Sequence, residues 1–363
     1  MIGKSGRLGT FCPGSIDDVR VYNRALSADE IAQNYRAGAR KSSIGGSWLS
    51  GLTGWSFRKQ ITIDETKVDE NLTDFPVLVK LTSTNFDFTK ALSTGYDIRF
   101  TLSDGTTLLK YERERHDATN SLAEYWVKIP SVSGTVNTNF YIYYGNSSAA
   151  DGADPTNVWD ANFKMVQHLK DLTTSTTEDS TANNNDGTKK AVNEPIEADG
   201  KVGKGQSFDG SNDYVGAGNS ASLDTTSMTV ELWVKPSSIA SAQYLEAKRV
   251  SSNGWYMYVG PDGDIEFYSV TAAGDGNTLM IAANGTISAN VWQHVVMSYT
   301  SGNGKTYVNA VEKASDTTGT GDALTNTDIL YIGAKNAATV FNGLTDDVRV
   351  SNIARSAAWI KAS

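Results

Sequence analysis

The stretch Thr229-Val230-Glu231-Leu232-Trp233-Val234-Lys235-Pro236 decides the fold of the second half of the chain. Its side chains alternate with a period of two, the period of a strand that buries one face. Similar runs recur at residues 163–169, 255–259, 265–269, 292–299, 305–308 and 330–332. Asp209-Gly210, Asp262-Gly263 and Asn303-Gly304 are typical of the tight turns that join antiparallel strands. We therefore expect this half to be all-β.

The same period occurs upstream. Trp55, Phe57, Ile61 and Ile63 share one face of a predicted strand, and further runs follow at residues 75–81, 97–102, 107–113, 124–129 and 139–144. Ser103-Asp104-Gly105 predicts a hairpin turn between two of them. The composition becomes small and polar over residues 151–160. We therefore predict two β-sandwich (jelly-roll) domains, over residues 55–150 and 151–363.

Composition and charge exclude several classes of protein. The chain of 363 residues carries a net charge of −9, which argues against a nucleic acid as partner because phosphate binding needs clustered Lys and Arg. The single cysteine, Cys12, excludes an intrachain disulfide and a cysteine-based metal site. No apolar run reaches the roughly 20 residues of a membrane span. Residues 1–7 lack the apolar region of a signal peptide, so we expect none in this chain.

One phrase occurs twice. Gly14-Ser15-Ile16-Asp17-Asp18-Val19-Arg20-Val21 returns as Gly343-Leu344-Thr345-Asp346-Asp347-Val348-Arg349-Val350. Only a dozen residues precede the first copy, so we interpret residues 1–40 as the C-terminal piece of another domain of the second kind. Ser27-Ala28-Asp29-Glu30 is a capping box, which predicts a short helix after the strand. Residues 41–54 are rich in Gly and Ser and are predicted to be a linker.

Five phrases in order resemble the laminin-G-like, concanavalin A-type family. They are Asp179-Ser180-Thr181-Ala182-Asn183 with its continuation to Gly187, Ser207-Phe208-Asp209-Gly210-Ser211-Asn212-Asp213-Tyr214-Val215, the stretch from Thr229 to Pro236, Trp292-Gln293-His294-Val295-Val296, and the closing phrase from Asn342 to Arg349. The resemblance covers about residues 160–363. It implies a concanavalin A-like sandwich for the second domain.

Residues 55–150 resemble domain-of-unknown-function family 2341. The resemblance rests on Trp55-Ser56-Phe57-Arg58-Lys59, Asp74-Phe75-Pro76-Val77-Leu78-Val79, Asp97-Ile98-Arg99-Phe100 and Tyr141-Ile142-Tyr143-Tyr144-Gly145-Asn146. That family typically precedes laminin-G-like domains in prokaryotic surface proteins. It implies no known chemistry.

One loop predicts a structural calcium site. Asp179, Asn183, Asn185 and Asp186 place oxygen ligands close together, and Ca²⁺ takes 6–8 oxygens. In the resembling family the two ends of the domain meet, and this adds Asp346 to the predicted set. The alternative is that these side chains make turns by bonding their own backbone.

Two ligand-binding or catalytic hypotheses remain. Exposed aromatic rings can stack on sugars, and Tyr244, Trp255 and Tyr256 are our candidates, although alternation should bury either the Trp255 face or the Tyr256 face. Asp262-Gly263-Asp264-Ile265-Glu266 puts carboxylates at every second position, as in some concanavalin A-type glycoside hydrolases. Its Asp-Gly start favours a hairpin turn instead. The three histidines, His116, His168 and His294, show no metal-site spacing.

We therefore expect a non-catalytic surface or adhesion protein that binds a glycan or another surface protein, with Ca²⁺ as a structural ion. The alternative is a structural subunit of a virion, such as a decoration or fibre protein, or of a cell-surface assembly, and a glycoside hydrolase is the third choice. The expected location is extracellular, at the cell surface or at the virion surface. Residues 1–40 are predicted to pair with a second copy or a neighbouring subunit, because a strand without its own sheet exposes unpaired backbone groups.

Overall fold

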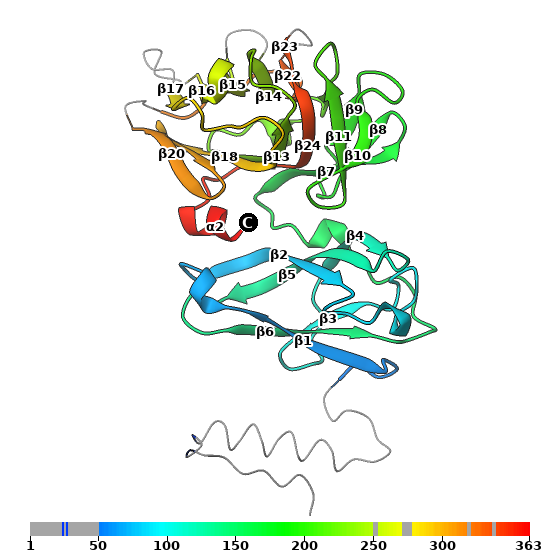
Figure 1. Ribbon diagram of the computed structural model, residues 1–363. Helices are drawn as coiled ribbons and strands as arrows, with labels where there is room; N and C mark the ends of the chain where they lie inside the picture. The colour runs from blue at the N-terminus through cyan, green and yellow to red at the C-terminus, as the bar shows by residue number, and fades with distance from the viewer. Residues whose placement is uncertain are drawn as a thin grey trace, which may run out of the picture. The chain divides into compact units, whose positions relative to one another are not determined.

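The computed structural model describes residues 24, 27, 51–249, 253–270, 278–317, 321–335 and 339–363. The predicted strand and helix of residues 1–40, the predicted linker and Cys12 lie outside these ranges. Residues Trp55–Ser103 and Thr107–Ser363 form one compact unit. The fold is all-β, as predicted, and it contains two sandwiches in sequence (Figure 1).

The first sandwich has two antiparallel sheets of three strands each, in the orders β1-β6-β3 and β2-β5-β4. The strands are β1 (Phe57–Ile63), β2 (Leu72–Thr82), β3 (Arg99–Leu102), β4 (Tyr111–Asp117), β5 (Leu122–Val132) and β6 (Thr138–Tyr144). Short 3-10 helices lie at η1 (Glu65–Lys67), η2 (Phe88–Lys90) and η3 (Pro155–Asn157). β4 begins four residues later than predicted, because Leu108 only forms an isolated bridge with Thr101 before the strand starts.

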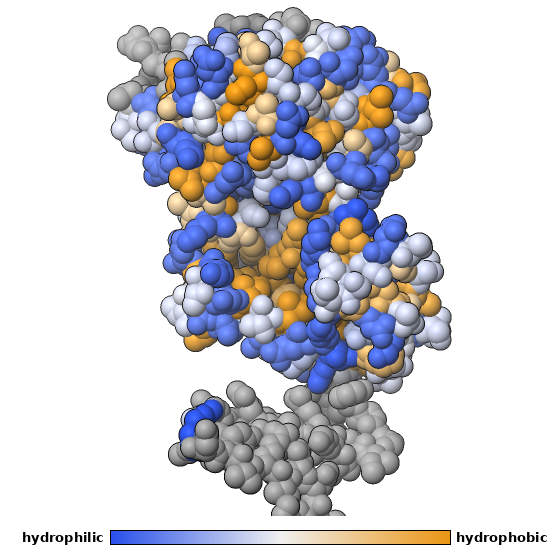
Figure 2. Space-filling view, viewed as in Figure 1, coloured by the Kyte–Doolittle hydropathy of each residue, from blue (hydrophilic) through white to orange (hydrophobic). Residues whose placement is uncertain are grey.

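Aromatic rings fill the centre of the first sandwich. Phe100 contacts Tyr111 and Tyr125 at ring-centroid distances of 5.4 and 5.6 Å, and the Tyr111 hydroxyl donates to the Ile98 carbonyl. A second apolar region remains open: a cavity of about 290 Å³ lies between β1 and β2, lined by Ile61, Ile63 and Leu78 among others. Figure 2 shows hydrophobic side chains in a hollow over this part of the surface.

The second sandwich is built by the remaining strands, which are joined into one hydrogen-bonded network. They are β7 (Phe163–Thr173), β8 (Thr176–Asp179), β9 (Gly187–Lys189), β10 (Ile196–Asp199), β11 (Lys204–Asp209), β12 (Val215–Gly216), β13 (Met228–Pro236), β14 (Gln243–Lys248), β15 (Trp255–Val259), β16 (Ile265–Ser269), β17 (Thr278–Ala282), β18 (Gln293–Thr300), β19 (Asn303–Val308), β20 (Val311–Asp316), β21 (Tyr331–Ile332) and β24 (Asn342–Ser351). β22 (Ala334–Lys335) and β23 (Thr339–Val340) form a separate pair, and η4 (Ala221–Leu223), η5 (Pro261–Gly263) and α2 (Ala357–Ala362) complete the domain.

The stretch from Thr229 to Pro236 forms β13 and shows how the core is positioned. Val230, Leu232 and Val234 are fully buried among the apolar residues of the second sandwich. Glu231, on the opposite face, is also buried, although a sandwich strand with one free face would expose it. The neighbouring β24 is buried from Thr345 to Ser351 for the same reason. Both faces of these two strands are therefore covered.

Residues of the second sandwich complete the core of the first. Trp159, Phe163 and Val166 belong to the same apolar cluster as the residues of β2 and β5, and the ring of Trp359 in α2 lies 4.8 Å from that of Phe75. Lys361 adds an ion pair with Asp69 at 2.7 Å. One apolar core therefore includes residues from both sides of residue 150. The predicted domain boundary at that residue stays a prediction.

Among the residues with described positions, no helix has both the length and the apolar character of a membrane span.

Candidate functional site

The outer surface of β14, β15 and β16 carries four tyrosines. In the antiparallel register Tyr244 lies opposite Tyr258, and Tyr256 lies opposite Tyr268, so the four side chains share one face of the sheet. All four are half-buried. We call Tyr244, Tyr256, Tyr258 and Tyr268 the tyrosine face.

The rings of the tyrosine face contact one another closely. Tyr256 and Tyr268 are stacked, with centroids 5.1 Å apart and an angle of 11° between their planes. Tyr244 meets Tyr256 edge-on at 5.2 Å and also contacts Tyr258 at 5.1 Å. Such contacts hold the rings in fixed orientations, so the surface is pre-organised.

Two cations lie over these rings. Lys335 Nζ is 5.2 Å from the centroid of Tyr244 and 5.1 Å from that of Tyr256, and Arg249 Cζ is 4.6 Å from that of Tyr268. All three distances are within the range of cation–π attraction. Burial raises the pKa of Tyr256 to about 12. Burial and, to a smaller extent, the charge of Arg249 lower the pKa of Lys335. The face therefore offers apolar rings, hydroxyl groups and positive charge together.

Trp255 does not belong to this surface. Its side chain is 2% exposed and packs in the core with Met257, because alternate residues of β15 point to opposite faces. The predicted ligand-binding set is corrected accordingly: Trp255 faces the core, whereas Tyr244 and Tyr256 remain on the outer surface.

In the predicted calcium loop, hydrogen bonds already surround Asp179. Its Oδ1 accepts from the amides of Val166 and Thr181, and its Oδ2 accepts from the Asn185 amide and the Thr181 hydroxyl, all within 3.0 Å. Asp186 accepts from the Asp179 amide at 2.8 Å. The two bonds with Thr181 are of the turn-making kind that the alternative interpretation describes, whereas the Val166 amide lies 13 residues away in the chain.

The other predicted ligands have separate partners. Asn183 Nδ2 donates to the Phe163 carbonyl, and Asn185 Nδ2 donates to the Lys164 carbonyl. Asp346 is fully buried, and its Oδ2 accepts from the Val202 amide at 2.8 Å. Within the described ranges, Asp179, Asp186 and Asp346 do not gather their oxygens within 4.8 Å of one another. The predicted calcium ligands therefore stay a prediction.

A different set of carboxylates is gathered. Glu194, Asp209 and Asp213 bring one oxygen each within 4.8 Å of one another. Asp213 is 3% exposed; its Oδ2 accepts from the Asp209 amide, and its Oδ1 has no hydrogen-bond partner among the described residues. Burial raises the pKa of Asp213. Asp209 and Asp213 belong to one of the five family phrases, and Glu194 belongs to none of them.

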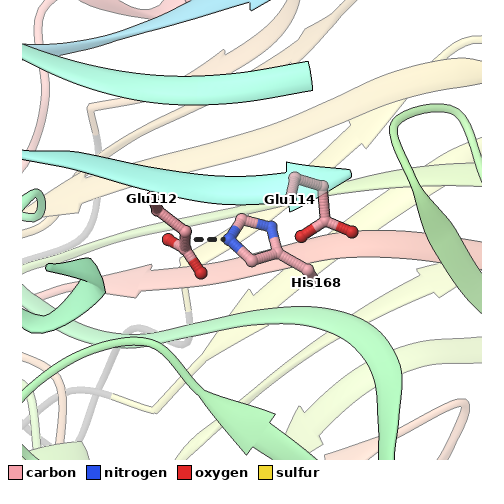
Figure 3. Close-up of side chains that lie close together, drawn as sticks. All are labelled: Glu112, Glu114 and His168. Carbon is pink, nitrogen blue, oxygen red and sulfur yellow. Dashed lines mark ion pairs between the residues drawn. The ribbon is translucent and has the colours of Figure 1, made fainter. Parts of the chain in front are cut away.

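A second cluster lies where the two sandwiches meet. Figure 3 shows Glu112 and Glu114, two residues apart on β4, on either side of the His168 ring from β7. One ligand atom of each lies within 4.8 Å of the others, and all three side chains are buried. His168 Nε2 is 3.3 Å from Glu112 Oε2, in an ion pair without hydrogen-bond geometry. Sequence reasoning missed this cluster because its members come from different sandwiches, 54 residues or more apart in the chain.

Neighbouring groups orient the cluster. The Trp159 indole N–H donates to Glu112 Oε2 at 3.0 Å, the Ser180 hydroxyl donates to Oε1 at 2.6 Å, and His168 Nδ1 lies 3.1 Å from Asp347 Oδ1. Burial alone would lower the pKa of His168, whereas Glu112, Glu114 and Asp347 raise it well above its usual value. Both Glu114 oxygens lack a hydrogen-bond partner among the residues described, and burial raises the pKa of Glu114.

The closing phrase of the sequence continues this network into the second sandwich. Arg349 pairs with both Asp347 oxygens at 3.0 and 2.5 Å, and its Nη1 lies 3.6 Å from Glu231 Oε1. Its guanidinium lies over the rings of Trp126 and Trp159, at 4.4 and 5.0 Å. Strands from both sandwiches thus share one buried charged network.

Comparisons with known proteins match two family models to different parts of the chain. Residues 209–361 match the model of the concanavalin A-like lectin/glucanases superfamily (laminin G), and residues 94–183 match that of a domain of unknown function, DUF2341. The chain therefore contains a laminin-G-like domain of the concanavalin A-like superfamily and a DUF2341 domain. The DUF2341 match extends beyond residue 150 into β7 and β8.

Solved structures resemble part of this chain at low similarity. Domain 4 of the arabinanase AbnA from Geobacillus stearothermophilus, in complex with arabinotriose, is 22% identical with a TM-score of 0.44, covering 56% of this chain and 98% of that one. The binding domains of Paraclostridial Mosquitocidal Protein 1 and botulinum neurotoxin serotype G are 14% and 13% identical, each with a TM-score of 0.45. Those matches cover 57% and 55% of this chain but only 52% and 50% of the toxin domains. The search of curated proteins found no match.

Proposed function

We propose that the protein is a non-catalytic binding module of a cell or virion surface, and that the tyrosine face holds a glycan. The observation that carries this proposal is the stack of half-exposed rings on one sheet face, with Lys335 and Arg249 over them. Sugars bind by stacking their apolar faces on aromatic rings while polar groups bond their hydroxyls. Arabinotriose is the ligand of domain 4 of AbnA. For this chain, the proposal of glycan binding rests on the tyrosines.

The tyrosine face extends across the sheet. Ala247 lies between Tyr256 and Tyr331 in one cross-strand row, since it pairs with both. Two strand spacings separate the two rings, about 10 Å. Tyr331 also contacts Tyr214 edge-on at 5.3 Å. The row therefore places aromatic rings on both sides of a small residue, an arrangement suited to an extended chain of sugars.

The non-catalytic part of the proposal rests on the local backbone before β16. Asp262 has a φ of 71° within the turn η5, and Gly263 follows at 78°. Only Glu266 of the three alternating carboxylates lies within the strand, opposite Tyr258. The turn interpretation explains Asp262 without a catalytic role, and Glu266 is then available to accept hydrogen bonds from sugar hydroxyls.

A glycan array followed by calorimetry tests the proposal. The substitution Tyr256→Ala should weaken binding of the best glycan by at least about tenfold, or 1.4 kcal/mol. Tyr141→Ala is the matched control, because Tyr141 carries Arg58 over its ring at 4.3 Å but lies in the first sandwich. Equal affinity of the Tyr256→Ala variant and the wild type would exclude the tyrosine face. Ordered self-assembly without any glycan binding would favour a structural subunit, and glycan cleavage would overturn the non-catalytic assignment.

Calcium as a structural ion stays part of the proposal. The gathered oxygens of Glu194, Asp209 and Asp213 support it better than the predicted loop, whose carboxylates already accept backbone hydrogen bonds. Adding Ca²⁺ to chelator-treated protein should raise the melting temperature, and Asp213→Asn should abolish that rise if this cluster binds the ion. Loss of the rise in Asp186→Asn alone would return the site to the predicted loop, and no rise in the wild type would remove calcium from the proposal.

A further inference from the structure

The cluster of Figure 3 contains three buried polar atoms without hydrogen bonds. They are both carboxylate oxygens of Glu114 and Nε2 of His168, whose side chains are 5% exposed each. Buried polar groups are nearly always satisfied, because an unpaired one costs about 1–3 kcal/mol. One ligand atom of each of Glu112, Glu114 and His168 lies within 4.8 Å of the others, so a cation held among them would satisfy these atoms.

The surroundings prepare His168 to donate an electron pair. Asp347 Oδ1 lies 3.1 Å from Nδ1, so the Nδ1–H can donate to it, and Nε2 can bind a cation in place of its own proton. This arrangement of carboxylate, imidazole and cation is usual for histidines that bind metals. Glu112 is held in turn by the Trp159 indole and the Ser180 hydroxyl, and each of its oxygens keeps a further lone pair.

A small cavity borders the cluster on the side of Glu112 and His168. Its volume of about 10 Å³ is close to the minimum for one water molecule, and it is lined by Glu112, His168, Lys170, Glu178 and Ser180. Glu114 approaches the cluster from β4, two residues after Glu112, so both carboxylates come from the first sandwich and the imidazole comes from the second.

We infer that Glu112, Glu114 and His168 form a divalent metal site of the zinc type that links the first sandwich to the second. One imidazole with two carboxylates suits Zn²⁺, whereas Ca²⁺ takes oxygen ligands only. Three protein ligands and a water in the cavity make the four positions that Zn²⁺ prefers. This site is independent of the tyrosine face, and its ligand chemistry separates it from the proposed calcium site.

Titration calorimetry of the chelator-treated full chain with ZnCl₂ tests the inference. One zinc ion per chain should bind, tighter than Mn²⁺ and much tighter than Ca²⁺. Glu114→Gln keeps the shape of the side chain and removes its charge, so zinc affinity should fall by at least about 10–100-fold. Asp213→Asn is the control, since that residue lies in the oxygen-only cluster, and it should leave zinc binding unchanged.

The inference also has a readout that needs no variant. X-ray absorption of the zinc-loaded protein should show a nitrogen ligand at about 2.0–2.1 Å. No stoichiometric zinc binding, unchanged affinity in Glu114→Gln, or a zinc ion coordinated only by oxygen would each overturn the site. A glycan that still binds after zinc removal would leave the proposed function intact, so the two proposals fail separately.

Discussion

The buried network between the sandwiches and the tyrosine face use the same chemistry in opposite surroundings. Arg349 lies over Trp126 and Trp159 at 3% exposure, whereas Arg249 and Lys335 lie over half-exposed tyrosines. In the network the cation is held by Asp347 and Glu231, and the rings are covered by protein on both sides. On the face the rings meet solvent. The buried cation–aromatic contacts therefore stabilise the fold, whereas those on the tyrosine face leave ring surface exposed to solvent.

The largest expected change in stability concerns the buried network. Arg349→Ala leaves the carboxylates of Asp347 and Glu231 buried without their cation and should lower the free energy of unfolding by about 3–5 kcal/mol. Arg249→Ala, on the tyrosine face, should cost less than about 1 kcal/mol. Chemical denaturation of both variants measures the difference. Similar losses would show that the two surroundings do not differ as described.

A second test concerns the sheet beneath the tyrosine face. Glu246 of β14 is fully buried opposite Met257 and Ile332, neither of its oxygens has a partner among the described residues, and burial raises its pKa well above the usual value. Glu246→Leu removes this unpaired group and should stabilise the fold by about 1–3 kcal/mol at pH 8.

The sign of the pH dependence follows from the raised pKa of Glu246. Its contribution to stability is complete below the ordinary carboxyl pKa of the unfolded chain and is lost as the pH rises toward the folded pKa, by about 1.4 kcal/mol per pH unit. The advantage of Glu246→Leu over the wild type should therefore grow from about pH 4.5 upward. Glu266→Leu, on the outer face of the same sheet, is the control and should show a much smaller trend. A constant difference across pH would contradict the neutral state of Glu246.

The smallest expected change in stability concerns an exposed ion pair between the two sandwiches. Lys361 pairs with Asp69, and both side chains are about half-exposed at 49% and 51%. Lys361→Ala should change the unfolding free energy by less than about 1 kcal/mol, and salt should reduce even that. Denaturation at low and high ionic strength measures it. A loss comparable to that of Arg349→Ala would mean that exposure does not govern the strength of these ion pairs.

Several local features were predictable because they depend on neighbours in sequence. The period of two placed Val230, Leu232 and Val234 on the buried face of a strand, and Asp262-Gly263 predicted the turn before β16. The alternation of side chains along the strand also predicted that only one of Trp255 and Tyr256 faces outward. It did not say which one, because both faces of β15 carry large apolar side chains.

The all-β class, the strand positions and the two family resemblances could be predicted from the sequence, since these follow from local patterns. Only the tertiary structure decided what covers the second face of β13 and β24, and so made Glu231, Asp347 and Arg349 a buried network. It also brought Glu112, Glu114 and His168 together, and likewise Glu194, Asp209 and Asp213. The physical reason is that side-chain burial and ligand geometry arise from packing between distant segments, which a local pattern does not record.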